Sequence, residues 1–412
     1  MTTHHDLTRR TLLGTTAAAA LAMPGIALAQ NPAEVKVALL VPVSGMYSRF
    51  GAVMRMGAEM ALEHINAGGG VKALGGTKLK LVVLDCGDTT EKAKNAAQRM
   101  VAQEPDIVAA SGAYLSSFTL AVTEVTERAQ LPVLTLSYSD LITARGFKNV
   151  FQTSATAASQ AEQALPEILR LAESASGKRP QTVAIVTDNT GASVASVKPM
   201  REGLLQRLGL KLVVDETFTP PIADATPLVQ KVRAARPDLF FFLPTVISDA
   251  KLVLEKMNEF GMGQGRVPTI SFGIAIAMPD ILNTVSADLL QGVLSCVGNW
   301  GTKGQEKLIA ELKQKHNEPW MDQNAISTYG DMWIIKEALE RAGKADKVAV
   351  ADALRTLDLG PSKFYPGGQT KFDEMGRRVG AGLTVIQWQK GVPYTVFPTE
   401  LATATPFWGR GG

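Results

Sequence analysis

Short apolar runs alternate with longer amphipathic segments along most of this chain, and the alternation occurs in two separate series. The apolar runs lie at 35–41, 79–84, 107–110 and 131–136 in the first series, and at 182–187, 211–214, 239–243 and 269–272 in the second. The segments between them with apolar residues at helical spacing are 52–66, 90–103, 117–130, 194–208, 226–235 and 249–260. Continuous apolar runs of this length are typical of strands buried on both faces, and strands that alternate with helices form parallel sheets. The pattern therefore predicts an α/β fold with two doubly wound parallel-sheet lobes of similar size.

The composition is that of a large globular protein and not of a nucleic-acid-binding or membrane protein. The chain has 412 residues, of which 46% are hydrophobic and 20% charged, and this length favours two domains. Its formal net charge is only +3 and no lysine or arginine block stands out, so nucleic-acid binding has no electrostatic support. After Ala29 no apolar run is long enough to cross a bilayer, so we expect a mature protein that is not embedded in a membrane.

The first thirty residues have the features of an export signal. Arg9 and Arg10 precede an alanine-rich apolar stretch at 12–28, and Ala27-Leu28-Ala29 has the small-x-small pattern of a signal peptidase site. A membrane anchor is the alternative, but the run is short and is interrupted by proline and glycine. We predict a twin-arginine signal peptide at 1–29, cleaved near Ala29, and a periplasmic mature protein. The residue directly after the cleavage site is not a cysteine, which argues against a lipid anchor.

Motifs for covalent catalysis, phosphate binding or metal binding are absent from the sequence. It contains no Gly-x-Ser-x-Gly, Walker, His-Glu-x-x-His or Cys-x-x-Cys pattern, and His64 and His316 alone cannot form a typical zinc site. Cys86 and Cys296 are expected to be free thiols, with a bridge between them left open. We therefore expect no enzyme, no metal site and no cofactor. An exported hydrolase that uses paired carboxylates remains an alternative, because such pairs are not visible in a sequence.

A set of short segments in a fixed order connects the chain with a known family. They are Leu-Leu-Val-Pro-Val-Ser-Gly at 39–45, Phe-Gly at 50–51, Ile-Asn-Ala-Gly-Gly at 65–69, Gly-Ala-Tyr-Leu-Ser-Ser-Phe-Thr at 112–119, Leu-Pro-Val at 131–133, 183–188, and Ser-Thr-Tyr at 327–329. In these segments the chain resembles the type I periplasmic binding proteins of branched-chain amino acid ABC importers. The resemblance extends from Val35 to about Pro398.

The resemblance implies two lobes joined by a three-strand hinge, with a ligand bound in the cleft between them. By analogy, the first lobe comprises 34–156 plus 297–378, the second comprises 157–296 plus 379–400, and 401–412 is a tail. The implied function is the substrate-binding component of an ABC importer, with a small carboxylate as ligand and a membrane permease as partner. We expect a monomer that closes around its ligand. A ligand sensor of the same fold is the alternative.

Candidate ligand-binding residues in the first lobe follow the ends of its strands. Ser116 and Ser117 follow one strand and open the next helix, where free N–H groups and a hydroxyl can receive a carboxylate, and the resemblance places a carboxylate-binding serine here. It also implies backbone contacts to the ligand from Leu136 and Tyr138. Phe50 is a candidate aromatic cover for the ligand, with a position in the core as the alternative. Arg49 is a cation that could pair with an anionic ligand, with a solvated side chain as the alternative.

In the second lobe the match to the family weakens where an amino group would bind. Thr245 stands where the resemblance expects a tyrosine, and Gly273 stands where it expects the acid that binds an ammonium group. The segment 273–277 contains no acid at all. We therefore predict a carboxylate ligand without an α-ammonium group. An amino acid stays the alternative, because three aspartates near strand ends could replace the missing partner; they are Asp140, Asp188 and Asp249.

Overall fold

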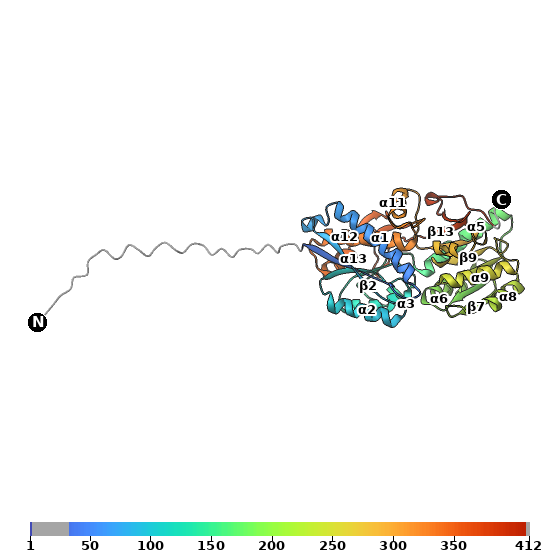
Figure 1. Ribbon diagram of the computed structural model, residues 1–412, viewed down its shortest axis with the longest axis horizontal. Helices are drawn as coiled ribbons and strands as arrows, with labels where there is room; N and C mark the ends of the chain where they lie inside the picture. The colour runs from blue at the N-terminus through green and yellow to red at the C-terminus, as the bar shows by residue number, and fades with distance from the viewer. Residues whose placement is uncertain (2–32, 409–412) are drawn as a thin grey trace.

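The computed structural model describes residues 33–408 together with Met1, and contains two large sheets, one parallel and one mainly parallel, with helices on both faces. The sheets and their helices form two lobes, which lie side by side along the long axis of the molecule in Figure 1. The predicted signal peptide and the last four residues of the predicted tail fall outside the described part. The predicted α/β fold with two doubly wound lobes is confirmed.

The first lobe is built on a five-stranded sheet in the order β2-β1-β3-β4-β5, and all its strand pairs are parallel. Its strands are β1 (Glu34–Val41), β2 (Lys78–Asp85), β3 (Ile107–Gly112), β4 (Val133–Thr135) and β5 (Val150–Gln152). Its helices are α1 (Ser48–Ala67), α2 (Thr90–Gln103), α3 (Ser116–Arg128), α4 (Leu141–Ala144), α11 (Glu306–His316), α12 (Gln323–Ala342) and α13 (Lys347–Arg355). Helices α1, α12 and α13 pack together, as do α2 and α3 (Figure 1).

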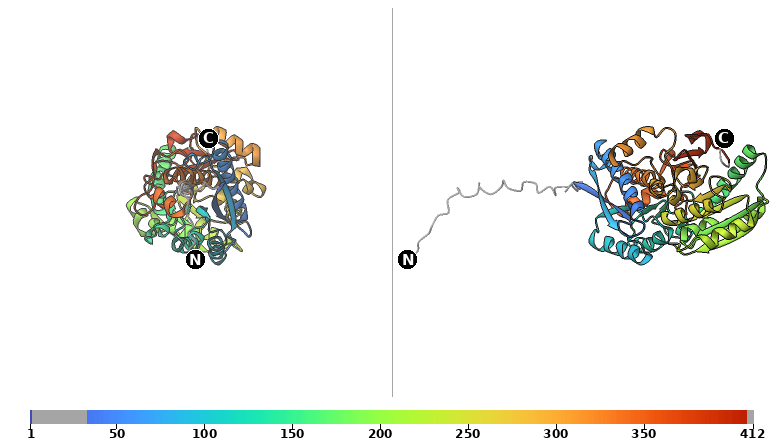
Figure 2. Two further views of the ribbon diagram at one scale, coloured as in Figure 1. Left: turned by 90° about the vertical axis from the view of Figure 1, so that its left-hand side faces the viewer. Right: turned by 45° about the vertical axis from the view of Figure 1, so that its right-hand side comes forward.

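The second lobe is built on a seven-stranded sheet in the order β14-β13-β10-β9-β8-β6-β7. Its parallel strands are β6 (Thr182–Asp188), β7 (Lys211–Phe218), β8 (Leu239–Leu243), β9 (Thr269–Phe272) and β10 (Leu294–Val297), and its antiparallel strands are β13 (Thr384–Gln389) and β14 (Val392–Phe397). Its helices are α5 (Ala157–Ser176), α6 (Gly191–Pro199), α7 (Leu205–Arg207), α8 (Thr226–Ala235), α9 (Ile247–Glu259) and α10 (Ala287–Leu290). Figure 2 shows this sheet with its covering helices from a second direction.

The chain passes between the two lobes three times. It leaves the first sheet after β5, returns after β10 to α11 and α12, and re-enters the second sheet at β13. A small antiparallel pair, β11 (Asp358–Pro361) with β12 (Gln369–Lys371), precedes the last passage. The lobe boundaries that we expected from the resemblance stay predictions.

Strand β8 shows why the second sheet is buried on both faces. Phe240 and Phe242 are fully buried on the face that carries α8 and α9, whereas Phe241 is fully buried on the face that carries α5 and α6. Because successive side chains of a strand point to opposite faces, an unbroken apolar run is required where helices cover both. This requirement explains why the parallel strands could be located in the sequence.

One predicted helix is wrong. The segment 194–208 was expected to be a single helix, but α6 ends at Pro199, a π-type turn occupies Met200–Leu204, and the short α7 follows. Gly203 in this turn has φ 135°, which no helix accommodates. A proline that lacks an N–H and a glycine with positive φ, four residues apart, interrupt the hydrogen-bond ladder of a helix.

Both cysteines are free and buried, as expected. Burial raises the pKa of the Cys86 thiol to about 12, and it also raises the pKa of Cys296, so neither is a reactive thiolate. Within residues 33–408 no helix is long and apolar enough to cross a membrane.

Candidate functional site

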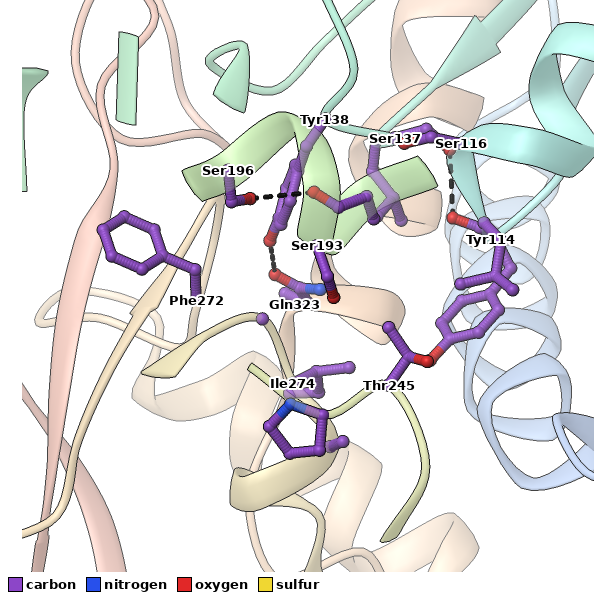
Figure 3. Close-up of a pocket in the computed structure, with 16 residues that line it drawn as sticks. Tyr114, Ser116, Ser137, Tyr138, Ser193, Ser196, Thr245, Phe272, Ile274 and Gln323 are labelled. Carbon is purple, nitrogen blue, oxygen red and sulfur yellow. Dashed lines mark hydrogen bonds between the residues drawn. The ribbon is translucent and has the colours of Figure 1, made fainter. Parts of the chain in front are cut away.

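A pocket lies between the two lobes, at the carboxyl ends of the strands of both sheets. It is narrow, with a cavity volume of about 40 Å³, and is partly open to solvent. The first lobe lines it with Tyr114, Leu115, Ser116, Leu136, Ser137, Tyr138 and Gln323, and the second with Ala192, Ser193, Ser196, Pro244, Thr245, Phe272, Gly273, Ile274 and Ala275 (Figure 3). Ligands of parallel α/β sheets bind at this edge, because helix N-termini converge there.

Ser116 begins helix α3 and is completely buried at the pocket. The preceding Leu115 offers no side chain to cap the helix, and the first intrahelical bond is the one from the Thr119 N–H to the Leu115 carbonyl. The N–H groups of the first turn are therefore available to an acceptor. The Ser116 hydroxyl oxygen accepts a hydrogen bond from the Ser139 N–H at 3.1 Å, which leaves its own proton free to be donated. This helix start is suited to a carboxylate.

Ser117 faces the other lobe and does not line the pocket. Gly191, the first residue of α6, lies next to it, and a β-carbon there would be in ordinary contact with the Ser117 nitrogen, at 3.6 Å. Helix α6 begins opposite α3, and the Thr190 hydroxyl caps it by accepting from the Ser193 N–H at 3.5 Å. The starts of α3, α6 and α12 thus all reach the pocket. Thr190 caps α6 and Asp322 caps α12, so of these three helix starts only that of α3 lacks a side-chain cap.

Four of the expected ligand-binding residues line the pocket from the loops that follow strands β4, β8 and β9. They are Leu136, Tyr138, Thr245 and Gly273. The backbone carbonyl of Leu136 accepts from the Ser154 hydroxyl at 2.7 Å, and that of Tyr138 accepts from the Ala157 N–H at 2.7 Å. These two carbonyls therefore already have partners. The part of Tyr138 that lines the pocket is its ring, whose hydroxyl bonds to Gln323 and to the Gly298 N–H.

Phe50 does not line this pocket, in contrast to our expectation of an aromatic cover. It is 1% exposed and stacks on Tyr114, with ring centroids 4.7 Å apart. Tyr114 lies between Phe50 and the pocket and has φ 66°, a conformation that is rare for a bulky residue. Tyr114, which sequence reasoning had not selected, therefore provides the aromatic surface of the first lobe.

Arg49 also lies away from the pocket and forms ion pairs instead of facing a ligand. Its guanidinium contacts Asp280 of the second lobe at 2.7 Å and Glu318, in the segment before α12, at 2.9 Å. Two carboxylates satisfy the cation, so it is not available to an anionic ligand. The pair with Asp280 is a contact between the lobes.

None of the residues that line the pocket is charged. The Asp188 carboxylate accepts four hydrogen bonds, at 2.7–3.0 Å, from the backbone and hydroxyl groups of Thr190 and Thr245. Asp140 accepts from the Ala158 N–H and lies 3.9 Å from Arg377. Both acids are therefore occupied by structural contacts.

Asp249 and Asp322 are the remaining acids near the site, and neither lines the pocket. Asp249 is fully buried; one oxygen accepts from the Ile222 N–H at 3.0 Å and the other has no partner among residues 33–408. Burial raises the pKa of Asp249 and raises that of Asp322 to about 6. Asp322 caps α12 by accepting from the Asn324 and Ala325 N–H groups at 2.9 and 3.0 Å. No acid of the described chain thus faces the pocket with a free oxygen.

Two α/β lobes with a neutral pocket enclosed between them define the chain as a two-lobe ligand-binding protein. Residues 34–392 match a family model described as "Periplasmic binding protein", and the chain belongs to this family. The Leu/Ile/Val-binding protein homolog 7 of Brucella suis is 27% identical over 379 residues, which cover 90% of this chain and 93% of the relative. The resemblance found in the sequence is confirmed.

Two solved structures show the same fold at low sequence identity. The branched-chain amino acid transporter substrate-binding protein of Streptococcus pneumoniae, in complex with isoleucine, has a TM-score of 0.73 at 19% identity, with 87% of this chain and 97% of that chain covered. A solute-binding protein of R. palustris, in complex with benzoate, has a TM-score of 0.72 at 15% identity, with 92% and 98% covered.

Proposed function

We propose that this protein is the exported substrate-binding component of an ABC importer and binds a small carboxylate without an α-ammonium group. The observation that carries the proposal is the pocket itself, which is lined by both lobes, contains no charged side chain and receives three helix starts. The lobes, with the boundaries 34–156 plus 297–378 and 157–296 plus 379–400, would close around the ligand.

The carboxylate is supported by the free N–H groups at the start of α3 and by the Ser116 hydroxyl. An anion at a helix N-terminus interacts favourably with the unpaired N–H groups and with the helix dipole. Closure of the two lobes around the ligand would remove the water that competes for these donors.

The absence of an α-ammonium group is supported by the acids near the site, none of which lines the pocket; Asp140, Asp188 and Asp322 also have partners elsewhere. A buried charge without a partner costs several kcal/mol, roughly 2–5. The uncapped start of α3, which favours an anion, disfavours a cation. Of the related structures, one holds isoleucine and the other benzoate, so this architecture accommodates both an amino acid and an amino-free acid. The lining of the present pocket favours the second class.

We propose binding without turnover, because the lining contains no histidine or cysteine and therefore no Ser–His or Cys–His pair. A thermal-shift screen of purified mature protein against aliphatic and aromatic carboxylates tests the function. Ligands of the predicted class raise the melting temperature, and binding one molecule per chain leaves the ligand chemically unchanged. Recovery of an altered compound would contradict the proposal and indicate an enzyme. A screen in which no carboxylate raises the melting temperature would contradict it as well.

A further inference from the structure

Gln323 contributes a polar side chain to the pocket from a part of the chain far from the other lining residues. It is the first residue of α12, is 4% exposed, and is the one lining residue that lies beyond position 275. Sequence reasoning did not select it, because no pattern around 323 marks a strand end.

The orientation of the Gln323 amide is fixed by a chain of hydrogen bonds. The Gly298 N–H donates to the Tyr138 hydroxyl oxygen at 3.0 Å, and the Tyr138 hydroxyl donates to Gln323 Oε1. A phenol has one proton, and burial raises the pKa of Tyr138, so the hydroxyl keeps that proton and points it at Oε1. The Gln323 Nε2 group therefore lies on the side away from Tyr138, among the lining residues (Figure 3).

The Gln323 Nε2 group makes no hydrogen bond to any residue between 33 and 408, whereas most other polar side chains of the pocket have partners within the protein. The hydroxyl groups of Ser137, Ser193 and Ser196 donate to the backbone carbonyls of Tyr114, Leu243 and Ala192, and that of Thr245 donates to Asp188. Gln323 thus presents two N–H donors to the pocket and no acceptor.

We propose that Gln323 is a specificity-determining residue whose Nε2 group donates to an uncharged oxygen acceptor of the ligand. The ligand class is then a carboxylate with a second oxygen acceptor, such as a 2-oxo acid, in which the oxygen replaces the ammonium group of an amino acid. An ammonium group has only hydrogen-bond donors, so it would face the Nε2 donors with no acceptor between them. Tyr138 is a positioning residue, because it prevents the amide from turning its oxygen toward the ligand. This inference rests on the proposed function.

The test measures, by calorimetry, a selectivity ratio: the affinity for 4-methyl-2-oxopentanoate divided by that for leucine. In Gln323→Glu the shape is retained but an acceptor replaces the donor. We expect the ratio to fall by roughly 10- to 100-fold, because the carboxylate repels the 2-oxo oxygen and forms a charge-assisted hydrogen bond with the ammonium group of leucine. In Tyr138→Phe the amide is free to rotate, and we expect the ratio to fall while the 2-oxo acid still binds. Gln206→Glu, on the exposed surface of α7, adds the same charge elsewhere and leaves the ratio unchanged.

Gln323→Met keeps the inference testable where the glutamate variant does not fold. It removes the donors without adding charge, so it weakens 4-methyl-2-oxopentanoate but not 4-methylpentanoate, which lacks the second acceptor. Melting temperatures verify that each variant is folded. An unchanged ratio in Gln323→Glu, or equal losses for both acids in Gln323→Met, would contradict the role of Gln323 while the proposed function stands. Failure of the wild type to bind any of these carboxylates would overturn both.

Discussion

At the scale of single residues, the position of Ser116 follows from local sequence, whereas the surroundings of Arg49 and Phe50 depend on distant residues. Ser116 follows an apolar run and begins an amphipathic one, and these two signals suffice to place it at the carboxyl edge of a sheet. Arg49 is paired by Asp280, which is far away in the sequence, and Phe50 is covered by Tyr114. The same reason explains why Gln323 could not be predicted: only the folded chain brings α12 to the pocket.

Ser116→Ala is expected to weaken binding of the carboxylate ligand. The hydroxyl donates to a charged acceptor in an enclosed pocket, an interaction worth roughly 1.5–3 kcal/mol, or about one to two decades in affinity. Calorimetry measures the effect, and the melting temperature shows whether the fold survives loss of the contact to Ser139. Ser117→Ala is the matched control, since Ser117 faces Gly191 and not the pocket. A larger loss in the control than in Ser116→Ala would place the ligand group at Ser117.

At the scale of elements, strands and helices with a strict apolar period could be located in the sequence, and those without it could not. Strands β8 and β9 and helices α2 and α8 have the predicted bounds, because burial on defined faces imposes their patterns. The edge pair β13–β14 was not predicted, since its antiparallel strands follow no βαβ alternation. Helix α6 was misjudged because apolar spacing continued through Pro199 and Gly203.

The ion pair between α1 and the turn after β9 is expected to stabilise contact between the lobes. Asp280→Asn removes the charge that meets Arg49 across the contact between the lobes. Both side chains are partly exposed, so we expect only about a twofold to fivefold loss of affinity, caused by faster ligand release. Stopped-flow release rates measure it. Glu104→Gln breaks a pair with Lys36 inside the first lobe and leaves the release rate unchanged. Equal release rates for Asp280→Asn and wild type would contradict a role for this contact in closure.

Asp331 of α12 links this helix to β3 and makes stability depend on pH. Its carboxyl accepts from the Ser111 hydroxyl at 2.6 Å and from the Tyr365 hydroxyl, and burial raises its pKa from 3.8 to about 6. Between these two pKa values the folded protein holds a proton that the unfolded chain has lost, so the free energy of unfolding falls as pH rises.

Asp331→Asn does not titrate and lacks this dependence. The wild-type minus variant difference in unfolding free energy should therefore fall by about 1–3 kcal/mol from about pH 4 to 7. Urea unfolding at several pH values measures it. A difference that stays constant, or that grows as pH rises, would contradict the assigned direction of the shift.

At the scale of the whole molecule, we expect a protein that is exported and then closes on its ligand. Replacement of Arg9 and Arg10 by lysine is expected to abolish accumulation of the mature form in the periplasm, because the twin-arginine route requires both arginines. Cell fractionation measures it. Normal periplasmic levels of the double variant would show that export follows another route.

The central claim, that the pocket prefers a carboxylate without an α-ammonium group, is tested most directly by calorimetry with matched ligand pairs. The pairs are 4-methyl-2-oxopentanoate against leucine and phenylpyruvate against phenylalanine, which differ at the α-carbon alone. An unpaired ammonium in the closed pocket costs roughly 2–5 kcal/mol, so the amino-free acid should bind tens- to thousands-fold more tightly. Tighter binding of the amino acid in both pairs would contradict the account and point to Asp249, whose second carboxylate oxygen has no partner in the described chain.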